Sequence, residues 1–151
     1  MTLSVMFVSA DEVRPLRTRI LRPGYPPERL LVFPEDDHSE CAHVAAISDG
    51  KIIGVATFLL KPTVQLDDPQ AIQLRGMAVD TQMQGQGVGK CILDFALEEL
   101  EKRFSKSKWV WCNARQSAAH FYDRCGFEIL SDSFDIPEIG PHFVMARKII
   151  C

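Results

Sequence analysis

The sequence contains no apolar run that approaches the roughly 20 residues of a membrane-spanning helix. The amino-terminal residues show no basic stretch ahead of an apolar segment and no convincing cleavage site, which argues against a signal peptide. Internal repeats and low-complexity segments are also missing. We therefore expect a globular, cytoplasmic protein without membrane attachment, rather than a secreted, membrane-spanning or disordered one.

Neither sign of charge dominates, because 17 basic residues stand against 20 acidic ones and leave a formal net charge of −3. This balance argues against a nucleic-acid partner bound through bulk positive charge. The 151 residues suit a single domain spanning 1–151, and 46% hydrophobic residues suffice to bury a core. A chain of this length needs no disulfide or metal for stability.

Closely spaced metal ligands are missing as well. The cysteines are odd in number, widely spaced and without a C-x-x-C pair: Cys41, Cys91, Cys112, Cys125 and Cys151. The four histidines form no recognisable ligand pattern with them. We therefore expect free thiols in a reducing compartment and no bound metal.

Hydrophobic periodicity divides the chain into alternating strands and helices. Strands are expected at about 6–9, 41–47, 52–60, 71–79, 108–114, 127–130 and 142–150, and helices at about 11–22, 90–104 and 117–125. Asp11 is the expected N-cap of the first helix, and segments 22–40 and 131–141 are expected to be loops. Gly54 is expected to mark a bulge. The order predicts an α/β fold with a central, mixed and largely antiparallel sheet of about six to seven strands, flanked by about three to four helices.

The most informative segment is the glycine-rich run Q-G-Q-G-V-G-K at residues 84–90, between a predicted strand and a predicted helix. Glycines let backbone N–H groups approach an anion, and the helix N-terminus adds partial positive charge. A phosphate or pyrophosphate is therefore the expected ligand. A P-loop is excluded, because Gln84 replaces its first glycine and Cys91 its Ser or Thr. The dinucleotide fingerprint is excluded too, because Lys90 replaces its third glycine.

The spacing Q-x-x-G-x-G of Gln84, Gly87 and Gly89 resembles the acyl-CoA-binding motif of the GNAT superfamily of N-acetyltransferases. A second segment, which begins with Asn113-Ala114-Arg115 and ends with Gly126-Phe127, is similar to the family's N-A-R…A…F-Y-x-x-x-G-F segment. One predicted helix and one predicted strand separate the two motifs, which is the order of the family. The resemblance covers about residues 71–127.

The resemblance implies a single GNAT domain whose sheet is splayed between its fourth and fifth strands, with acetyl-CoA as co-substrate in the gap. It also implies the residues that bind the cofactor. Backbone groups of Met77, Ala78 and Val79 would bind the pantetheine amides, and N–H groups of Gln84, Gly85, Gln86, Gly87, Val88, Gly89 and Lys90 would bind the pyrophosphate. Asn113 would bind the pantetheine arm, and Ala119, Phe121 and Tyr122 belong to the short helix beside the cofactor.

The implied reaction is direct attack of a neutral amine on the thioester in a ternary complex. The Val79 N–H would stabilise the oxyanion, and Tyr122 would donate a proton to the leaving sulfur. Tyr122 could instead only pack in the core. The general base is open: His142 is the first candidate, and Glu40 and His43 are alternatives. Gln73 stands where some family members carry a carboxylate.

Charged residues near the implied acceptor site have two interpretations. The arginines of the first helix, Arg14, Arg17, Arg19 and Arg22, could bind an acidic substrate, but we expect most of them at the surface. The acidic run at residues 35–37 could attract a cationic amine, but such runs are usually solvated. Neither group identifies the acceptor.

The sequence thus predicts an acetyl-CoA-dependent transfer of an acetyl group to a primary amine of a small molecule or peptide. The sequence does not distinguish among aminoglycosides, polyamines, amino acids, protein N-termini and lysines as the acceptor. A non-catalytic acyl-CoA-binding sensor and a partner-dependent subunit are the alternatives. The apolar terminal run 143–151 could pair with a second copy, so a homodimer is expected, with no nucleic-acid or membrane partner.

Overall fold

The computed structural model describes residues 2–149, so Cys151 and the end of the predicted last strand lie outside the described residues. The strands are β1 (Ser4–Val8), β2 (Cys41–Ser48), β3 (Lys51–Leu60), β4 (Ile72–Val79), β5 (Trp109–Arg115), β6 (Glu128–Ile129), β7 (Phe134–Ile136) and β8 (Gly140–Lys148). The helices are α1 (Ala10–Leu21), α2 (Val88–Arg103) and α3 (Ala119–Arg124), with short 3-10 turns η1 (Thr81–Met83) and η2 (Gln116–Ala118). No helix within residues 2–149 is long and apolar enough to cross a membrane.

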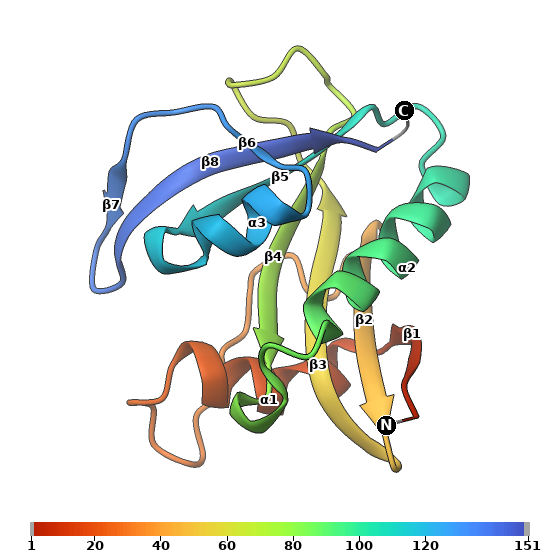
Figure 1. Ribbon diagram of the computed structural model, residues 1–151, viewed down its shortest axis with the longest axis vertical. Coiled ribbons are helices and arrows are strands. Elements are labelled where there is room, and N and C mark those ends of the chain that lie inside the picture. The colour runs from red at the N-terminus through yellow and green to blue at the C-terminus, as the bar shows by residue number, and fades with distance from the viewer. Residues whose placement is uncertain (1, 150–151) are drawn as a thin grey trace. The chain divides into compact units, whose positions relative to one another are not determined.

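The eight strands form a mixed sheet in the order β1-β2-β3-β4-β5-β8-β6, with β7 paired to β8 (Figure 1). This α/β architecture confirms the predicted fold class. The chain divides into two compact units, which are described separately. Unit 1 comprises residues 2–59 and 76–100, and unit 2 comprises residues 60–75 and 101–149.

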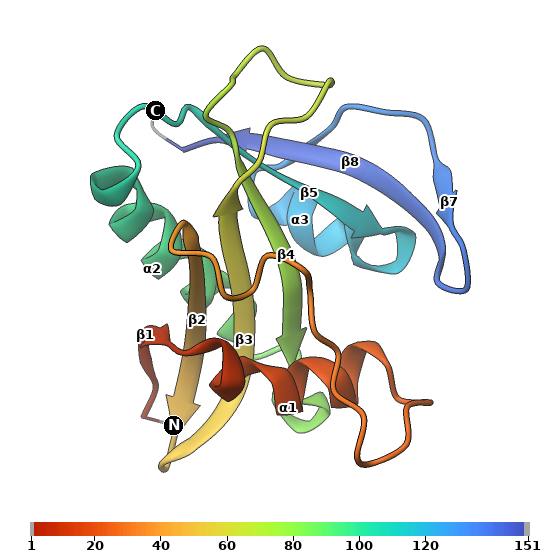
Figure 2. The ribbon, with the colours of Figure 1, turned by 180° about the vertical axis from the view of Figure 1, so that it is seen from behind.

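Unit 1 contains β1, β2 and β3 as an antiparallel ladder, in which Met6 lies opposite Ala45 and Ala45 opposite Val55. The end of β4, from residue 76, belongs to the same unit. Helices α1 and α2 cover opposite faces of these strands, as Figures 1 and 2 show from the two sides. The α1 face is closed by a buried cluster of Val13, Leu16, Ala45, Val55 and Ala78.

The expected N-cap Asp11 is wrong, because the N-cap of helix α1 lies two residues earlier in the sequence. Ser9 is the N-cap: its hydroxyl accepts from the Glu12 N–H at 3.3 Å, and the Glu12 carboxylate accepts from the Ser9 N–H at 3.0 Å. This reciprocal arrangement satisfies two N–H groups that the helix leaves open. Asp11 lies in the first turn instead, where its negative charge interacts favourably with the partial positive charge at the N-terminus of the helix.

Gly54 lies where β3 passes under α2. The β2–β3 register shifts next to it, between Ala46 and Ile47, which confirms the expected bulge. A Cβ at Gly54 would also approach Val88 to 2.8 Å and Ile92 to 2.9 Å. The glycine therefore permits the start of α2 to pack closely on the strand.

Unit 2 is built on an antiparallel ladder between β5 and β8, from Trp109 opposite Lys148 to Arg115 opposite His142. The start of β4 runs parallel to β5, with Ile72 beside Val110 and Gln73 beside Trp111. Helix α3 lies on one face of β5 and β8 (Figures 1 and 2). A cluster of Ala71, Trp111, Val144 and Ala146 is buried in this unit.

Strand β7 lies inside the segment 131–141 that was expected to be a loop, and β8 begins at Gly140, so that expectation is wrong for residues 134–136 and 140–141. Phe134 pairs with His142 of β8. Three residues are too few to show an alternating pattern, and Pro137 follows them directly. Only pairing with β8 makes this segment a strand.

Candidate functional site

The glycine-rich segment connects β4 to α2 in unit 1. Gly85 and Gly87 have φ angles of +78° and +82°, in the left-handed region that favours glycine. A Cβ at either position would meet no atom within 4 Å, so the backbone conformation, not close packing, requires these glycines. Helix α2 begins at Val88, two residues earlier than predicted. The carbonyl of Gly87 accepts a hydrogen bond from the Cys91 N–H at 3.0 Å, at the start of the helix.

The fold leaves the backbone N–H groups at the start of this segment without partners. Within residues 2–149, the backbone N–H groups of residues 84–87 have no hydrogen-bond partner. The side chains instead stabilise the loop: the Gln84 amide donates to the Val79 carbonyl at 3.1 Å, and the Gln86 amide donates to the Gln82 carbonyl at 3.3 Å. The loop thus has the donors and the helix terminus that an anionic group requires.

The residues expected to bind the pantetheine arm lie directly after Gly76, which has a φ of +65°. A Cβ at Gly76 would lie 3.0 Å from Arg17 Nε and 3.2 Å from the Phe33 ring. Ala78 is buried in the core of unit 1, whereas Met77 and Val79 are half-buried. The buried part of α1 and the following loop therefore lie directly against this part of β4.

Arg17 and Asp36 form a buried ion pair, contrary to the surface position expected for most of these charged residues. Arg17 is 0% exposed and Asp36 is 3% exposed. The guanidinium donates to the two carboxylate oxygens at 2.8 and 3.2 Å, and also to the Thr57 hydroxyl at 2.7 Å. Arg14, also buried, lies 3.4 Å from Asp36. The loop of residues 22–40 is thereby tied to α1 and β3.

Two effects act on the pKa of the Asp36 carboxyl. Burial by itself raises this pKa, because it penalises the charged form. The hydrogen bonds from Arg17 and from the Phe33 N–H, together with the positive charge of Arg17, outweigh burial and hold the pKa below its ordinary value. Asp36 is therefore a carboxylate that binds Arg17, not a proton acceptor for a substrate.

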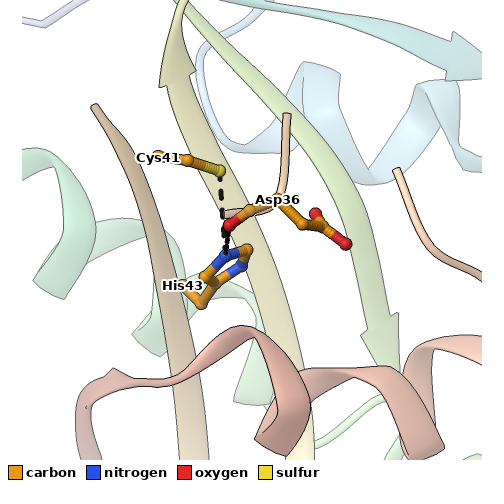
Figure 3. A group of neighbouring side chains, drawn as sticks. All are labelled: Asp36, Cys41 and His43. Carbon is orange, nitrogen blue, oxygen red and sulfur yellow. Dashed lines mark hydrogen bonds between the residues drawn. The ribbon is translucent and has the colours of Figure 1, made fainter. Parts of the chain in front are cut away.

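Asp36, Cys41 and His43 bring three possible ligand atoms within 4.8 Å of one another. Figure 3 shows the Asp36 carboxylate turned away from the other two side chains. Arg17 occupies that carboxylate, and His43 Nε2 donates to the Asp36 carbonyl at 2.9 Å. His43 Nδ1 lies 2.8 Å from the Thr57 hydroxyl, so both ring nitrogens are used within the protein. This donor set does not fit a cation, and His43 fits a structural role better than that of a base.

In unit 2, Asn113 is exposed on β5, while Ala119 and Phe121 of α3 are half-buried. Tyr122 is 7% exposed and packs between Phe121 and Phe127, with ring centroids 5.1 and 5.2 Å away. Its hydroxyl has no hydrogen-bond partner in the described part of the chain. Burial, and to a lesser degree the Cys112 and Cys125 thiols, raise the pKa of Tyr122 well above its ordinary value. The phenol is therefore protonated at neutral pH.

His142 is 4% exposed at the start of β8 in unit 2. Its Nδ1 lies 2.7 Å from the Gly140 carbonyl, which only accepts, so Nδ1 carries a proton. In the neutral ring Nε2 then holds the lone pair. Glu40, the other carboxylate considered as a base, is exposed directly before β2 in unit 1. Within unit 2, His142 thus has the tautomer that proton acceptance at Nε2 requires.

Comparison with known proteins agrees with these features. The family model of the Acetyltransferase (GNAT) family matches residues 10–127. The chain is 33% identical to the uncharacterised N-acetyltransferase YitI of Bacillus subtilis (strain 168) over 148 residues, which is 97% of each chain.

Solved structures show the same fold. The structure of Escherichia coli ElaA matches with a TM-score of 0.75 at 16% identity, over 97% of this chain and 99% of that one. An aminoglycoside 6'-N-acetyltransferase complexed with coenzyme A matches with a TM-score of 0.67 at 14% identity, over 100% of this chain and 98% of that one. The chain belongs to the GNAT family and is an acetyl-CoA-dependent N-acetyltransferase.

Proposed function

We propose that this protein transfers the acetyl group of acetyl-CoA to a primary amine of a small molecule or peptide, by direct attack in a ternary complex. The observation that carries the proposal is the run of unpartnered N–H groups at residues 84–87, held by two left-handed glycines ahead of α2. In a Q-x-x-G-x-G motif, these donors fit the pyrophosphate of the cofactor.

Further residues would bind the remaining parts of acetyl-CoA. In unit 1, backbone groups of Met77, Ala78 and Val79 would bind the pantetheine amides, and Val88, Gly89 and Lys90 would complete the anion site at the first turn of α2. In unit 2, Asn113 would hydrogen-bond the pantetheine arm, and Ala119 and Phe121 would contact it. Bound acetyl-CoA supplies the thioester carbonyl and the sulfur leaving group.

Tyr122 is proposed as the general acid. Its unpartnered hydroxyl and the raised pKa of its phenol support this role, because the proton is present at neutral pH and is not engaged elsewhere. As the amine nitrogen bonds to the carbonyl carbon, the carbon–sulfur bond breaks and the sulfur receives the phenol proton. The Val79 N–H is proposed to donate to the oxygen that becomes negative in the transition state.

His142 is proposed to accept, through water, the proton that the nitrogen loses after attack. The hydrogen bond of Nδ1–H to Gly140 supports this assignment, because it leaves the Nε2 lone pair for a proton. Transfer of that proton to solvent and uptake of one by the Tyr122 phenolate return both side chains to their starting states. The net reaction converts one amine and one thioester to one amide and one thiol.

The experiment is calorimetric titration of acetyl-CoA into the wild-type protein and three variants. Gly87→Glu and Gln86→Glu each add a negative charge to the proposed anion site, and Gln86→Glu does so without a left-handed backbone position. Gly24→Glu is the control, since a Cβ there meets no atom within 4 Å and Gly24 lies outside the glycine-rich segment 84–90. We expect at least tenfold weaker binding for both loop variants and unchanged binding for Gly24→Glu.

Release of coenzyme A thiol in the presence of primary amines then measures turnover. Equal binding by wild type and Gln86→Glu would contradict the pyrophosphate assignment. Tight binding by the wild-type protein without thiol release above hydrolysis, for any amine, would contradict the proposed acetyl transfer.

A further inference from the structure

Asp80 follows β4 directly and leads into the 3-10 turn η1, which precedes the glycine-rich segment. Its backbone N–H donates to the Ile53 carbonyl of β3 at 2.8 Å, and its backbone carbonyl accepts from the Met83 N–H at 2.8 Å. Its carboxylate oxygen Oδ1 accepts from the Gln82 N–H at 3.2 Å, so the side chain caps the turn. These residues all belong to unit 1. Asp80 therefore fixes the backbone between β4 and Met83.

The open N–H groups of the glycine-rich segment begin directly after this turn. Gln82 and Met83 donate to Asp80, whereas the N–H groups of residues 84–87 have no partner within residues 2–149. Ordering each loop residue costs conformational entropy, so the open donors keep one arrangement only if the ends of the segment hold them. Helix α2 holds one end, and the turn capped by Asp80 holds the other. The Gln86 amide donates to the Gln82 carbonyl at 3.3 Å, so its position depends on the same turn.

Asp80 also places a negative charge four residues before the first of the open N–H groups proposed to bind the pyrophosphate. The hydrogen bonds from the Gln82 N–H and from Arg19 hold the pKa of the Asp80 carboxyl below its ordinary value, so it is charged at neutral pH. Neighbouring negative charges repel each other. An asparagine could cap the turn without a charge, because its side-chain oxygen accepts in the same way. The carboxylate therefore needs a balancing charge if an anion is to bind well nearby.

Arg19 of α1 supplies the balancing charge. Its Nη2 donates to Asp80 Oδ2 at 3.2 Å, across 61 residues of the chain. This oxygen is not the one that caps the turn, so a single carboxylate makes both contacts. The Arg19 side chain is 57% exposed, and an ion pair with an exposed member adds little to stability, because water and salt screen it. Stability alone therefore gives little reason for this pair.

We propose that Asp80 and Arg19 position the cofactor site: the Asp80 carboxylate holds the turn that orders the open N–H groups, and Arg19 neutralises this carboxylate so that a pyrophosphate can bind next to it. This inference rests on the pyrophosphate site proposed above. Both are positioning residues, since they act through the loop and need not touch acetyl-CoA. They form and break no covalent bond, so their effect is on the affinity for acetyl-CoA.

Matched variants separate the two roles. Asp80→Asn and Asp80→Ala both remove the charge, but only asparagine keeps an oxygen that accepts from the Gln82 N–H. Arg19→Gln removes the partner charge and leaves the turn residues intact. Arg22→Gln is its control, because it removes the same charge from the C-cap of α1, where the guanidinium donates to the Leu21 carbonyl at 2.9 Å. Calorimetric titration of acetyl-CoA gives the Kd, and thermal unfolding gives the Tm.

The charge balance predicts opposite effects of the two single charge variants. Arg19→Gln should bind acetyl-CoA about three- to tenfold more weakly than wild type, and Asp80→Asn equally or more tightly. The double variant, neutral like the ion pair, should bind about as wild type does. The loss in Arg19→Gln should shrink in about 0.5 M NaCl, where exposed charges are screened, and its Tm should stay within about 2 °C of wild type. Weaker binding by both single variants, or an equal loss in Arg22→Gln, would overturn the role of the charge.

The turn predicts a difference between the neutral variants of Asp80. Asp80→Ala should bind acetyl-CoA at least about tenfold more weakly than Asp80→Asn, because the Gln82 N–H loses its acceptor and the loop loses its order. Asp80→Ser, whose hydroxyl can accept the same bond, should restore much of the affinity. Ser9→Ala is the control for stability, since it removes a comparable cap from α1. Equal binding by Asp80→Ala and Asp80→Asn, or an equal loss in Ser9→Ala, would overturn the role of the turn.

The outcomes also distinguish this inference from the proposed function. Wild-type affinity in both Arg19→Gln and Asp80→Ala overturns the roles of the two residues and leaves intact the pyrophosphate site, which Gln86→Glu tests. No binding of acetyl-CoA by the folded wild-type protein overturns both proposals.

Discussion

The backbone N–H of Phe127 donates to the carbonyl oxygen of Tyr122 at 3.0 Å, and the two rings lie 5.2 Å apart. Between them, the Gly126 N–H donates to the Asp123 carbonyl at 3.0 Å, and Gly126 has a φ of +88°. These two bonds and the ring contact form a Schellman motif at the end of α3. The ring proposed to act as the acid is thus held by the helix terminus, while its hydroxyl stays unengaged.

Gly126→Ala tests this arrangement. A non-glycine residue in the left-handed region costs about 1 kcal/mol, and the nearest atom to the new Cβ, Arg147 Nη1, is 4.0 Å away, so the cost is conformational. Urea denaturation should show a free energy of unfolding lower by about 1 kcal/mol, and kcat should fall more than the KM for acetyl-CoA rises. Gly24→Ala, without a left-handed φ, is the control, and an equal effect there would contradict the explanation.

Tyr122→Phe should reduce kcat by about a hundredfold or more, since it removes the proposed proton donor. Because the hydroxyl has no partner among the described residues, the free energy of unfolding should not fall. Thiol release and thermal unfolding measured on the same samples check both statements. A stable variant with wild-type kcat would leave Tyr122 only a packing role.

The raised pKa of Tyr122 also predicts a pH dependence. Folding favours the protonated phenol, so its contribution to stability is full below the ordinary value of about 10 and is lost as pH rises through the folded value. Deprotonation of Tyr122 should therefore cause no loss of kcat up to about pH 9.5. A fall in kcat at lower pH that disappears in Tyr122→Phe would contradict this prediction.

Asp36→Asn should lower the free energy of unfolding by about 3–5 kcal/mol, because it leaves the fully buried Arg17 without its counter-charge. The matched control is Asp37→Asn, since the Asp37 side chain is 83% exposed. The pKa of Asp36 is shifted down, whereas that of Tyr122 is shifted up, so the two side chains affect stability in opposite pH ranges. The stabilisation by the Asp36 carboxylate is present above its unfolded pKa and is lost as pH falls below about 4. Urea titrations between about pH 3 and 7 should show a weaker acid dependence in Asp36→Asn than in wild type.

Gly54→Ala should disturb the start of α2. The new Cβ would lie 2.8 Å from Val88, the first residue of the helix after the glycine loop. Overpacking of this kind costs about 1–3 kcal/mol, and any shift of Val88 moves the proposed anion site. Calorimetry should show weaker acetyl-CoA binding than for Gly24→Ala. Unchanged affinity and stability would mean that the helix tolerates the methyl group.

Much of the fold follows from local sequence patterns. Short apolar runs predicted the strands at 41–47 and 52–60, and the stripe of Leu93, Leu97 and Leu100 predicted the helix at 90–104, because these patterns depend on near neighbours. The N-cap at Ser9 and the strand at residues 134–136 were missed. Ser9 was missed because Asp11, two residues later, is an equally good capping residue. The strand at 134–136 was missed because it forms only by pairing with β8.

The sequence by itself determined the family and the chemistry to expect, because Gln84, Gly87, Gly89 and the segment from Asn113 to Phe127 each specify a local backbone structure. The site residues and the single domain inferred from them stay predictions, as does the homodimer. Only the tertiary structure decided which polar groups are satisfied. Arg17 meets Asp36 across 19 residues, and Gln73 finds no partner beside Trp111, because hydrogen bonding between distant residues depends on how the chain packs and not on any local pattern.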